Sequence, residues 1–233
     1  FGRTRQKVSL PESVPGADLI PKYALQEFHS LPNGNYSKRI TRGYVTGFDH
    51  SMLGVMIEAR KCIAKTLQNC SSVLDAGCAG GRTARALKDA GISEVWGLDP
   101  SPYLLQHAAI DNPDISFVQG VAEDTRFPSE RFDGIAACFL FHEIPPRFVD
   151  KALTEFNRIL QPNGLIAICE PSPLQVDLSL WQILKKFGLK GFYFGVLARF
   201  VYEPFLNAWH KHSSQKEFFE QYGFEYFSDS VGM

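Results

Sequence analysis

A glycine-rich turn follows the first buried strand of the chain and has the composition of a ligand-binding site. The strand ends near Leu74, the turn contains Gly77, and a helix is expected to begin near Gly81. Glycine lets backbone N–H groups approach a ligand closely and permits a positive φ. Asp75 closes the strand, and its carboxylate would repel a pyrophosphate but attract an ammonium group. The turn therefore indicates a site for a cationic amino-acid group.

A second carboxylate closes the next predicted strand. Residues 94–99 are typical of a strand that ends in Asp99, 22 residues beyond Gly77. An acidic residue at this place can accept hydrogen bonds from both hydroxyls of a ribose. Alternatively, it only favours the start of the following helix, for which Ser101 is the predicted N-cap and Pro102 the first residue. The spacing favours the ribose interpretation.

These residues carry a resemblance to a known family. The run from Asp75 to Gly81 resembles the first motif of the class I S-adenosylmethionine (SAM)-dependent methyltransferases, Asp/Glu-x-Gly-x-Gly-x-Gly. Asp75, Gly77 and Gly81 match it, and Ala79 replaces the middle glycine, which is tolerable if the φ of Ala79 is negative. The resemblance implies a Rossmann-like α/β fold, with SAM as cofactor and S-adenosyl-L-homocysteine as product.

The resemblance also implies the other contacts of the cofactor. Ala122 and Glu123 match the residues that hold the adenine, with Asp124 as the rival and a solvated acidic turn as the plainer interpretation. The backbone N–H of Cys78 is expected to face the cofactor. The predicted cofactor-binding residues are Asp75, Gly77, Cys78, Gly81, Asp99, Pro100, Ser101, Ala122, Glu123, Cys138 and Phe139.

His142 is the candidate general base. It follows the fourth strand on the ligand side, and an imidazole with a pKa near 6.5 can accept a proton at neutral pH. Glu143 is expected to point elsewhere if the segment is extended, where it could orient a neighbour or cap the next helix. Two alternatives stay open: His142 only shapes the pocket, or the acceptor is nucleophilic enough to need no base.

Alternating strands and helices predict an α/β fold with a doubly wound, mostly parallel sheet. Five strands are expected, the first ending near Leu74 and the others at 94–99, 115–118, 132–138 and 165–169. A helix at 215–222 and a sixth strand at 224–227 should follow. The family's seventh, antiparallel strand would have only residues 230–233, so it is expected to be absent, with a truncated chain as the alternative.

The chain divides into four predicted parts. They are an N-terminal tail and helical cap segment (1–70), a SAM-binding core (71–170), a helical lid or insertion (171–213), and a C-terminal helix and strand (214–233). Residues 1–22 are expected to be a mobile tail. The aromatic residues of 23–50 could fold over the mouth of a pocket or simply pack on the surface.

The insertion after the fifth strand is rich in aromatic residues. Residues 171–212 also carry five Lys or Arg against two Asp or Glu, a balance of 5 − 2 = +3. A substrate lid is one hypothesis, and burial of the aromatics against the sheet or a partner subunit is the plainer account. Peripheral membrane contact through 179–212 is a third, because aromatic and basic residues suit anionic headgroups.

Composition excludes several other classes of function. A net charge of −1 gives no overall basic field for nucleic acid, and no apolar run has membrane-spanning length. No Cys-x-x-Cys pair is present, which favours a reducing cytosol and a cytoplasmic location. No metal site is predicted, because His29, His50 and His107 are isolated and the pair in 210–212 lacks a third ligand. The chain begins at Phe1 rather than methionine, so its true start is expected to be missing.

The sequence therefore predicts a SAM-dependent methyltransferase that acts on a small, bulky or apolar acceptor, such as a lipid, a quinone-like ring or a secondary metabolite. The first alternative is a non-catalytic SAM-binding module, which the missing last strand keeps open. The second is an NAD(P)-dependent oxidoreductase, but its Gly-x-Gly-x-x-Gly motif would require glycine where this chain has Ala79 and Arg82. The oligomeric state is not predicted.

Overall fold

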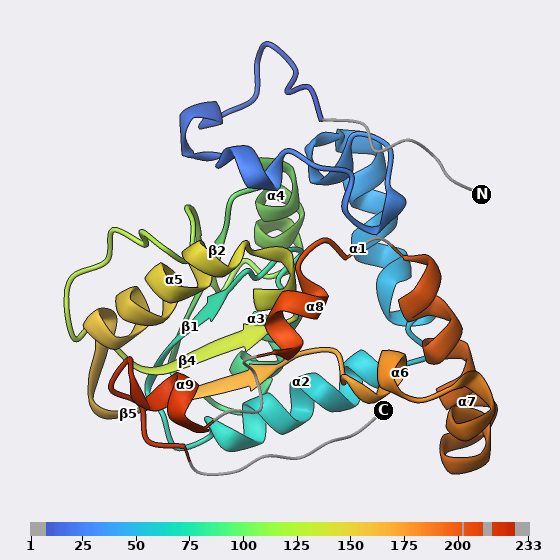
Figure 1. The fold of residues 1–233 in the computed structure, drawn as a ribbon. Helices are drawn as coiled ribbons and strands as arrows, with labels where there is room; N and C mark the ends of the chain where they lie inside the picture. Colours follow the sequence, from blue (N-terminus) through green and yellow to red (C-terminus); the bar gives the residue numbers. More distant parts are fainter. Residues whose placement is uncertain (1–7, 202, 212–215, 227–233) are drawn as a thin grey trace.

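The computed structural model describes residues 8–201, 203–211 and 216–226, and their centre is a five-stranded sheet (Figure 1). All its strand pairs are parallel, in the order β3-β2-β1-β4-β5. The strands are β1 (Ser72–Ala76), β2 (Glu94–Asp99), β3 (Ser116–Gln119), β4 (Phe132–Cys138) and β5 (Leu160–Cys169). The predicted α/β, doubly wound, parallel architecture is confirmed.

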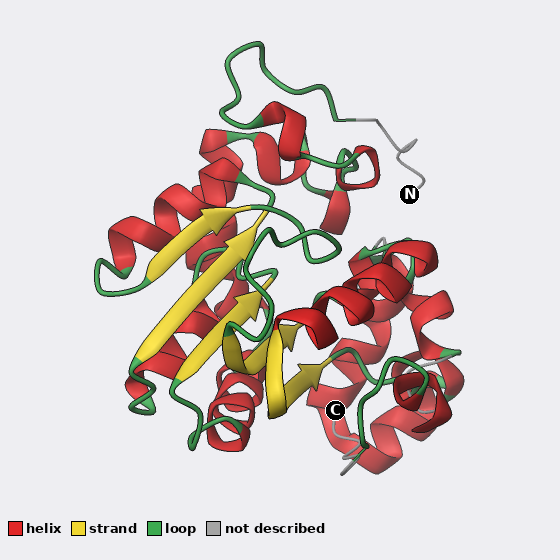
Figure 2. Cartoon of the chain, turned by 90° about the vertical axis from the view of Figure 1, so that its left-hand side faces the viewer, coloured by secondary structure: helices red, strands yellow, loops and turns green. Residues whose placement is uncertain are grey.

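Helices cover both faces of this sheet (Figure 2). Successive strand residues point to opposite faces, so Leu74 and Ile135 pack against one layer of helices and Val73 and Ala136 against the other. The first layer contains α5 (Pro146–Ile159), α8 (Leu206–His210) and α9 (Lys216–Glu220). The second contains α2 (Val55–Thr66) and α3 (Arg82–Asp89).

The local signals at the second strand and its helix were predicted correctly. α4 spans Pro102–Asp111, and the Ser101 hydroxyl accepts the N–H of Leu104 as an N-cap. The structure differs at the fifth strand, which begins at Leu160 rather than at residue 165. Its first residue pairs with Phe132 before an irregularity in the ladder. Asn163 and Gly164, a pair typical of turns, lie inside the strand.

The N-terminal segment is not a tail where the structure describes it. Val8, Val14 and Ile20 are buried against Tyr36 and Tyr103, so the expectation of a mobile tail was wrong for residues 8–22. The segment continues through short 3-10 turns, η1 (Ala17–Leu19), η2 (Lys22–Ala24), η3 (Phe28–Ser30) and η4 (Gly34–Tyr36), into α1 (Lys38–Ser51). It lies against the sheet edge where β2 ends (Figure 1).

The region after β5 is helical, as predicted. It contains α6 (Leu174–Asp177), α7 (Leu180–Phe200) and α8, whose Trp209 stacks on Phe141 in the main core with ring centroids 4.8 Å apart. The predicted sixth strand was wrong for residues 224–226, which join no strand, and Phe227 and residues 230–233 lie outside the described residues. Within the described chain, no helix combines the length and apolar character needed to cross a membrane.

Candidate functional site

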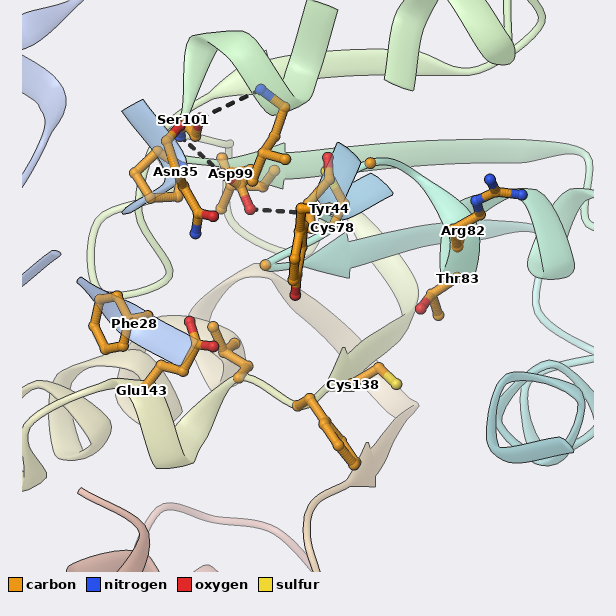
Figure 3. A pocket seen from close by; sticks show the side chains of 18 of the residues that line it. Phe28, Asn35, Tyr44, Cys78, Arg82, Thr83, Asp99, Ser101, Cys138 and Glu143 are labelled. Carbon is orange, nitrogen blue, oxygen red and sulfur yellow. Dashed lines mark hydrogen bonds between the residues drawn. The ribbon is translucent and has the colours of Figure 1, made fainter. Parts of the chain in front are cut away.

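A cavity opens where the carboxyl ends of β1, β2 and β4 meet the N-terminal segment (Figure 3). One side, the sheet-edge wall, consists of the turn 77–80, Asp99 and Cys138. The other side, the cap wall, consists of residues from 23 to 60, among them the aromatic residues Tyr23, Phe28, Tyr36, Tyr44 and Phe48. Parallel sheets of this type bind ligands outside the carboxyl ends of their strands, so this cavity is the candidate site.

The cavity brings together eight of the eleven predicted cofactor-binding residues. They are Gly77, Cys78, Asp99, Pro100, Ser101, Ala122, Cys138 and Phe139. Asp75, Gly81 and Glu123 do not line it. Gly81 instead begins α3, and Glu123 accepts hydrogen bonds from the hydroxyl of Tyr23, at 2.7 Å to Oε1. These three residues therefore lie one layer behind the cavity surface.

Asp99 faces the cavity with a strongly held carboxylate. Its Oδ2 accepts the backbone N–H of Ala79 at 2.9 Å, and its Oδ1 accepts that of Ser101 at 2.8 Å. Burial is the main reason that the pKa of Asp99 rises to about 7, although both hydrogen bonds oppose the shift. The side chain has a fixed orientation and two oxygens that can each accept a further hydrogen bond.

Asp75 supports the turn from behind. Its Oδ2 accepts the N–H of Ala84 in the first turn of α3 at 2.8 Å, whereas its Oδ1 is buried without a hydrogen-bond partner. Burial raises the pKa of Asp75 to about 7, with the charge of Arg60 opposing the shift. An unpartnered buried carboxylate oxygen is unfavourable, so a cationic group that reached it would stabilise the ionised form.

The glycine-rich turn is tightly packed. Gly77 has a φ of +73°, and a Cβ there would lie 2.7 Å from Cδ1 of Leu140. A Cβ on Gly80 would lie 2.6 Å from Cγ2 of Val45 in the cap wall. Ala79 has a φ of +45°, so the negative φ that would make alanine an easy substitute for glycine is not found, and its N–H donates to Asp99. Strained backbone of this kind clusters at functional sites.

The cap wall was largely missed by the sequence analysis. Its aromatic side chains include Phe28, Tyr44 and Phe48. Figure 3 shows Phe28 and Tyr44 around the same space as Asp99 and Glu143. Tyr44 and Phe48 lie on α1, and their ring centroids are 5.1 Å apart. The sequence signal for this wall was the density of aromatic residues in 23–50, which indicated a pocket mouth as one of two options.

His29, interpreted from the sequence as an isolated histidine, lies between two carboxylates. Its Nε2 is 2.9 Å from Oε1 of Glu143, and its Nδ1 is 2.9 Å from Oε1 of Glu203. Burial disfavours the charged ring, but the hydrogen bonds to both carboxylates raise the pKa of His29 to about 10. The ring also stacks on Tyr44 with centroids 5.7 Å apart. His29 is therefore an imidazolium at neutral pH.

These three residues could also be considered as metal ligands, since their ligand atoms lie within 4.8 Å of one another. The two carboxylates, however, approach different nitrogens of the His29 ring. These contacts are those of an imidazolium that donates one hydrogen bond from each ring nitrogen. Ion pairing with an imidazolium accounts for the cluster.

His142 lies behind the cavity surface and does not line it. The residue is 1% exposed, its Nδ1 is 2.5 Å from Oε2 of Glu170, and its Nε2 is 3.6 Å from Oε2 of Glu203. Burial disfavours the charged ring, but the charge and hydrogen bond of Glu170 raise the pKa of His142. In this geometry His142 does not reach a ligand in the cavity directly.

Glu143 is the residue of this turn that lines the cavity. The segment is not extended as expected: η5 (Phe141–Glu143) is a 3-10 turn, which directs Glu143 forward and His142 back. Oε1 of Glu170 accepts the N–H groups of Leu140 and Phe141 at 2.8 and 2.7 Å and fixes the turn. The extended conformation in which Glu143 would point elsewhere is therefore not found.

The cavity also has a buried cation that sequence analysis did not single out. Arg60 on α2 lines it, pairs with Asp49 through Nη1 at 2.5 Å, and lies close enough to influence the pKa of Asp75. The cofactor of the resembling family carries an ammonium and a carboxylate on its amino-acid end. The unpartnered oxygen of Asp75 and the guanidinium of Arg60 fit that pair of opposite charges.

The insertion does not cover this cavity. None of the described residues in 171–201 and 203–211 lines it, and the substrate lid stays a prediction. The insertion reaches the site only indirectly, where Glu203 pairs with His29. The N-terminal segment occupies the place that a lid would have.

A protein family described as a methyltransferase domain matches residues 74–168. This range begins at the third residue of β1, ends within β5, and includes every predicted cofactor-binding residue. The match therefore covers the sheet-edge wall of the cavity, and it excludes the cap wall of residues 23–60.

Curated relatives match the same part of the chain. Over 119 residues the chain is 36% identical to an uncharacterised methyltransferase of Synechocystis sp., covering 47% of this chain and 56% of the relative. Over 99 residues it is 30% identical to the demethylmenaquinone methyltransferase of Chlorobaculum tepidum, covering 42% of this chain and 40% of that one. The chain thus spans about half the length of the curated relatives it matches.

A solved structure extends the likeness of the fold beyond the matched range. It is a SAM-dependent methyltransferase of Thermotoga maritima, with a TM-score of 0.53 and 21% identity, covering 81% of this chain and 79% of that one. At this identity the likeness shows the fold alone.

Proposed function

We propose, on the premise that this chain carries a class I SAM-dependent methyltransferase domain, that it transfers a methyl group to a small, bulky and apolar acceptor. The observation that carries the proposal is the cavity between two unlike walls. The sheet-edge wall has the motif residues for SAM, and the cap wall offers aromatic surface for an acceptor. One cavity could therefore hold both reactants side by side.

The cofactor would be held by its polar ends. Asp99 would accept the ribose hydroxyls, and the turn at Gly77 and Cys78 would lie against the amino-acid end. The N–H groups of these two residues already donate to the carbonyl of Leu98, at 2.8 and 3.0 Å, so the expectation that the N–H of Cys78 faces the cofactor was wrong. Asp75 and Arg60 would balance the ammonium and the carboxylate. Ala122 would contact the adenine, whereas Glu123 would act from behind through its bond to Tyr23.

Bound SAM supplies an electrophilic methyl group, so the chain's main task is to orient the acceptor in line with it. The aromatic rings of Phe28, Tyr44 and Phe48 would hold an apolar acceptor and exclude water. Glu143 is the carboxylate that lines this space, and its Oε1 is fixed by His29. We propose Glu143 as the group that accepts a hydrogen bond or a proton from the acceptor.

His142, the base expected from sequence, would then be a positioning residue. It lies between Glu170 and Glu203, so it could hold the turn between β4 and α5 in a fixed position against the insertion. A direct catalytic role for His142 would require the turn to rearrange when the acceptor binds.

The acceptor class rests on the shape and polarity of the cap wall. Aromatic residues beside the carboxylate of Glu143 suit a flat, apolar ring bearing a hydroxyl or another hydrogen-bond donor. Two groups of relatives are named as quinone methyltransferases, at 30% identity over at most 99 residues. A quinone-like ring is thus a reasonable first acceptor to test, with lipids and secondary metabolites next.

Calorimetric titration with SAM, S-adenosylhomocysteine and NAD tests the cofactor. Tight binding of the first two and none of NAD is expected; the reverse would contradict the proposal. Release of labelled methyl groups to a demethylated menaquinone and to simple phenols tests turnover. Cofactor binding with no methyl release to any acceptor, including a cell extract, would favour the alternative of a non-catalytic SAM-binding module.

Two further proposals concern the setting of the protein. A cytoplasmic location and the absence of a nucleic-acid partner remain predictions. Contact of residues 179–212 with a membrane surface is also a proposal, and the next section narrows it to one face of α7.

A further inference from the structure

Exposed large apolar side chains are concentrated in one region of the described chain. Seven are exposed, and six of them belong to α7 or to residues 49–57, which contain the end of α1 and the start of α2 and are called the α1–α2 junction. On α7, Trp181, Leu189 and Phe200 are 80, 81 and 80% exposed. An isolated exposed leucine is ordinary, but a group of this kind marks an interaction surface.

The second half of α7 presents three of the exposed apolar side chains on one face. The helix is interrupted at Gly188 (φ 67°, ψ −163°) and then continues to residue 200. Leu189, Tyr193 and Phe200 are spaced by four and seven residues, which is about one and two turns. They therefore share a face, and Phe194 is buried on the opposite side.

The first half of α7 is a well-formed helix with the same character. It begins with a capping box between Ser179 and Gln182. Trp181 and Lys185 are one turn apart and both exposed, while Ile183 is buried toward the molecule. In Figure 1 α7 lies at the outer side of the molecule, away from the sheet.

The charged residues of α7 are also purely basic. The sequence from 178 to 201 contains no Asp or Glu but has Lys185, Lys186, Lys190 and Arg199, in a chain whose net charge is −1. The three lysines are exposed and form no ion pair within the described residues. Arg199 is different, because it donates to backbone carbonyls of 175 and 178 and so has a structural role.

The face is connected to the cavity. The hydroxyl of Tyr193 donates to the carbonyl of Ser51 at 2.8 Å, which joins α7 to the α1–α2 junction. Leu53 and Ile57 of that junction are exposed as well. Other residues of the same junction, including Asp49 and Met56, line the cavity. The surface thus lies beside the segment that forms the cap wall.

We infer that this face, formed by α7 and the α1–α2 junction, docks on an anionic lipid bilayer. Trp181, Leu189 and Phe200 would insert at the level of the headgroups, and Lys185, Lys186 and Lys190 would contact anionic lipids. The inference rests on the surface alone and holds whichever acceptor is methylated. Docking in this orientation would bring the cap wall near the membrane, where an apolar acceptor would be dissolved.

Co-sedimentation of the full chain with vesicles tests the inference. We expect binding to vesicles of phosphatidylcholine mixed with phosphatidylglycerol, and weaker binding to phosphatidylcholine alone. The variant K185Q/K186Q/K190Q should lose on the order of 100-fold in affinity for the anionic vesicles. The variant W181S/L189S/F200S should lose about tenfold or more on both compositions, because it removes the apolar insertion.

Matched controls separate this face from the rest of the surface. Ile110 on α4 is 76% exposed, so I110S removes an equally exposed apolar side chain elsewhere. K65Q/K151Q removes exposed lysines from α2 and α5. Both controls should bind vesicles like the unchanged chain. None of the substituted residues lines the cavity, so affinity for S-adenosylhomocysteine should be unchanged in every variant and reports that folding is intact.

Three results would overturn the inference. They are no binding to anionic vesicles, equal binding to neutral and anionic vesicles, or equal losses in the control variants. A concentration-dependent dimer in sedimentation equilibrium that the apolar variant abolishes would assign the face to a second copy of the chain instead.

Discussion

The two walls of the cavity are stabilised by contacts of different range. In the sheet-edge wall, Asp75 bonds to a residue nine positions away and Asp99 to one twenty positions away. In the cap wall, Tyr23 bonds to Glu123 across 100 positions, and His29 to Glu203 across 174. The first wall is therefore specified by short motifs, and the second by the folding of the whole chain.

The difference extends to charge. Asp99 in the sheet-edge wall and Asp75 behind it have raised pKa values because they are buried. In the cap wall the imidazolium of His29 is matched by two carboxylates. We infer that the sheet-edge wall is completed by a cationic ligand, whereas His29 in the cap wall is already held by two ion pairs before a ligand binds.

The largest expected effect is a loss of turnover when Glu143, beside the cap wall, is substituted. Glu143→Gln keeps the shape of the side chain but removes its charge, so methyl transfer should fall on the order of 100-fold or more if Glu143 accepts the acceptor's proton. Affinity for S-adenosylhomocysteine should change less than about threefold. Rates with the best acceptor found, together with calorimetry, measure the two.

The control is Glu58→Gln, an exposed carboxylate on α2, which should leave both quantities unchanged. His142→Asn distinguishes positioning from catalysis: a positioning role predicts lower thermal stability along with lower turnover. An unchanged rate in Glu143→Gln would remove this residue from the chemistry and reopen a direct role for His142.

The next largest expected effect is a loss of cofactor affinity when Asp99 in the sheet-edge wall is substituted. Asp99→Asn should weaken binding of SAM by about 10- to 100-fold, because a charged acceptor of hydrogen bonds is lost. Asp124→Asn, at the exposed rival in the neighbouring turn, should have no measurable effect. Calorimetry on both variants checks this, and equal affinities would contradict the ribose assignment.

A smaller effect is expected from pH. Because the pKa of Asp75 is about 7 without a ligand, a cationic group that requires its ionised form should bind about eightfold more tightly at pH 7.5 than at pH 6. Asp75→Asn should flatten this dependence. If the affinity of the Asp75→Asn variant still changes with pH to the same extent, the titrating group is another residue.

The same raised values set the sign of a stability change. Between pH 4 and 7 the folded chain holds more protons on Asp75 and Asp99 than the unfolded chain does. The free energy of unfolding contributed by these groups should therefore fall as pH rises through this range. Urea unfolding of the ligand-free chain measures it.

The smallest effect is expected from the hydrogen bond between Tyr23 in the cap wall and Glu123. Tyr23→Phe removes the hydroxyl that bonds to Glu123 and should lower the free energy of unfolding by about 1 kcal/mol. Cofactor affinity should fall only slightly. Urea unfolding of this variant and the unchanged chain measures the loss, and a tenfold loss of affinity would instead make Glu123 a direct cofactor contact.

The contrast between the walls also explains what the sequence could predict. Strand ends, the Ser101 cap and the glycine turn are local features, so the order of elements and the position of Asp99 followed from short patterns. Ala79 departed from expectation because its positive φ is imposed by a bond to Asp99. No local pattern contains that bond.

The cap wall could not be assembled in this way. His29 is unremarkable among its sequence neighbours, and its role depends on Glu143 and Glu203 reaching it through the fold. The orientation of Glu143 followed from a 3-10 turn held by Glu170, rather than from the extended segment assumed. The predicted sixth strand failed because aromatic alternation near 224 served packing against α9 instead of pairing with the sheet.

A crystal structure of the chain with S-adenosylhomocysteine tests the central claim most directly. It should place the ribose hydroxyls on Asp99, the amino-acid end against the turn at Gly77 and within reach of Arg60, and the sulfur facing Tyr44 and Glu143. A ligand bound elsewhere, or a ribose turned away from Asp99 with the glycine turn empty, would contradict the assignment of this cavity as the site of methyl transfer.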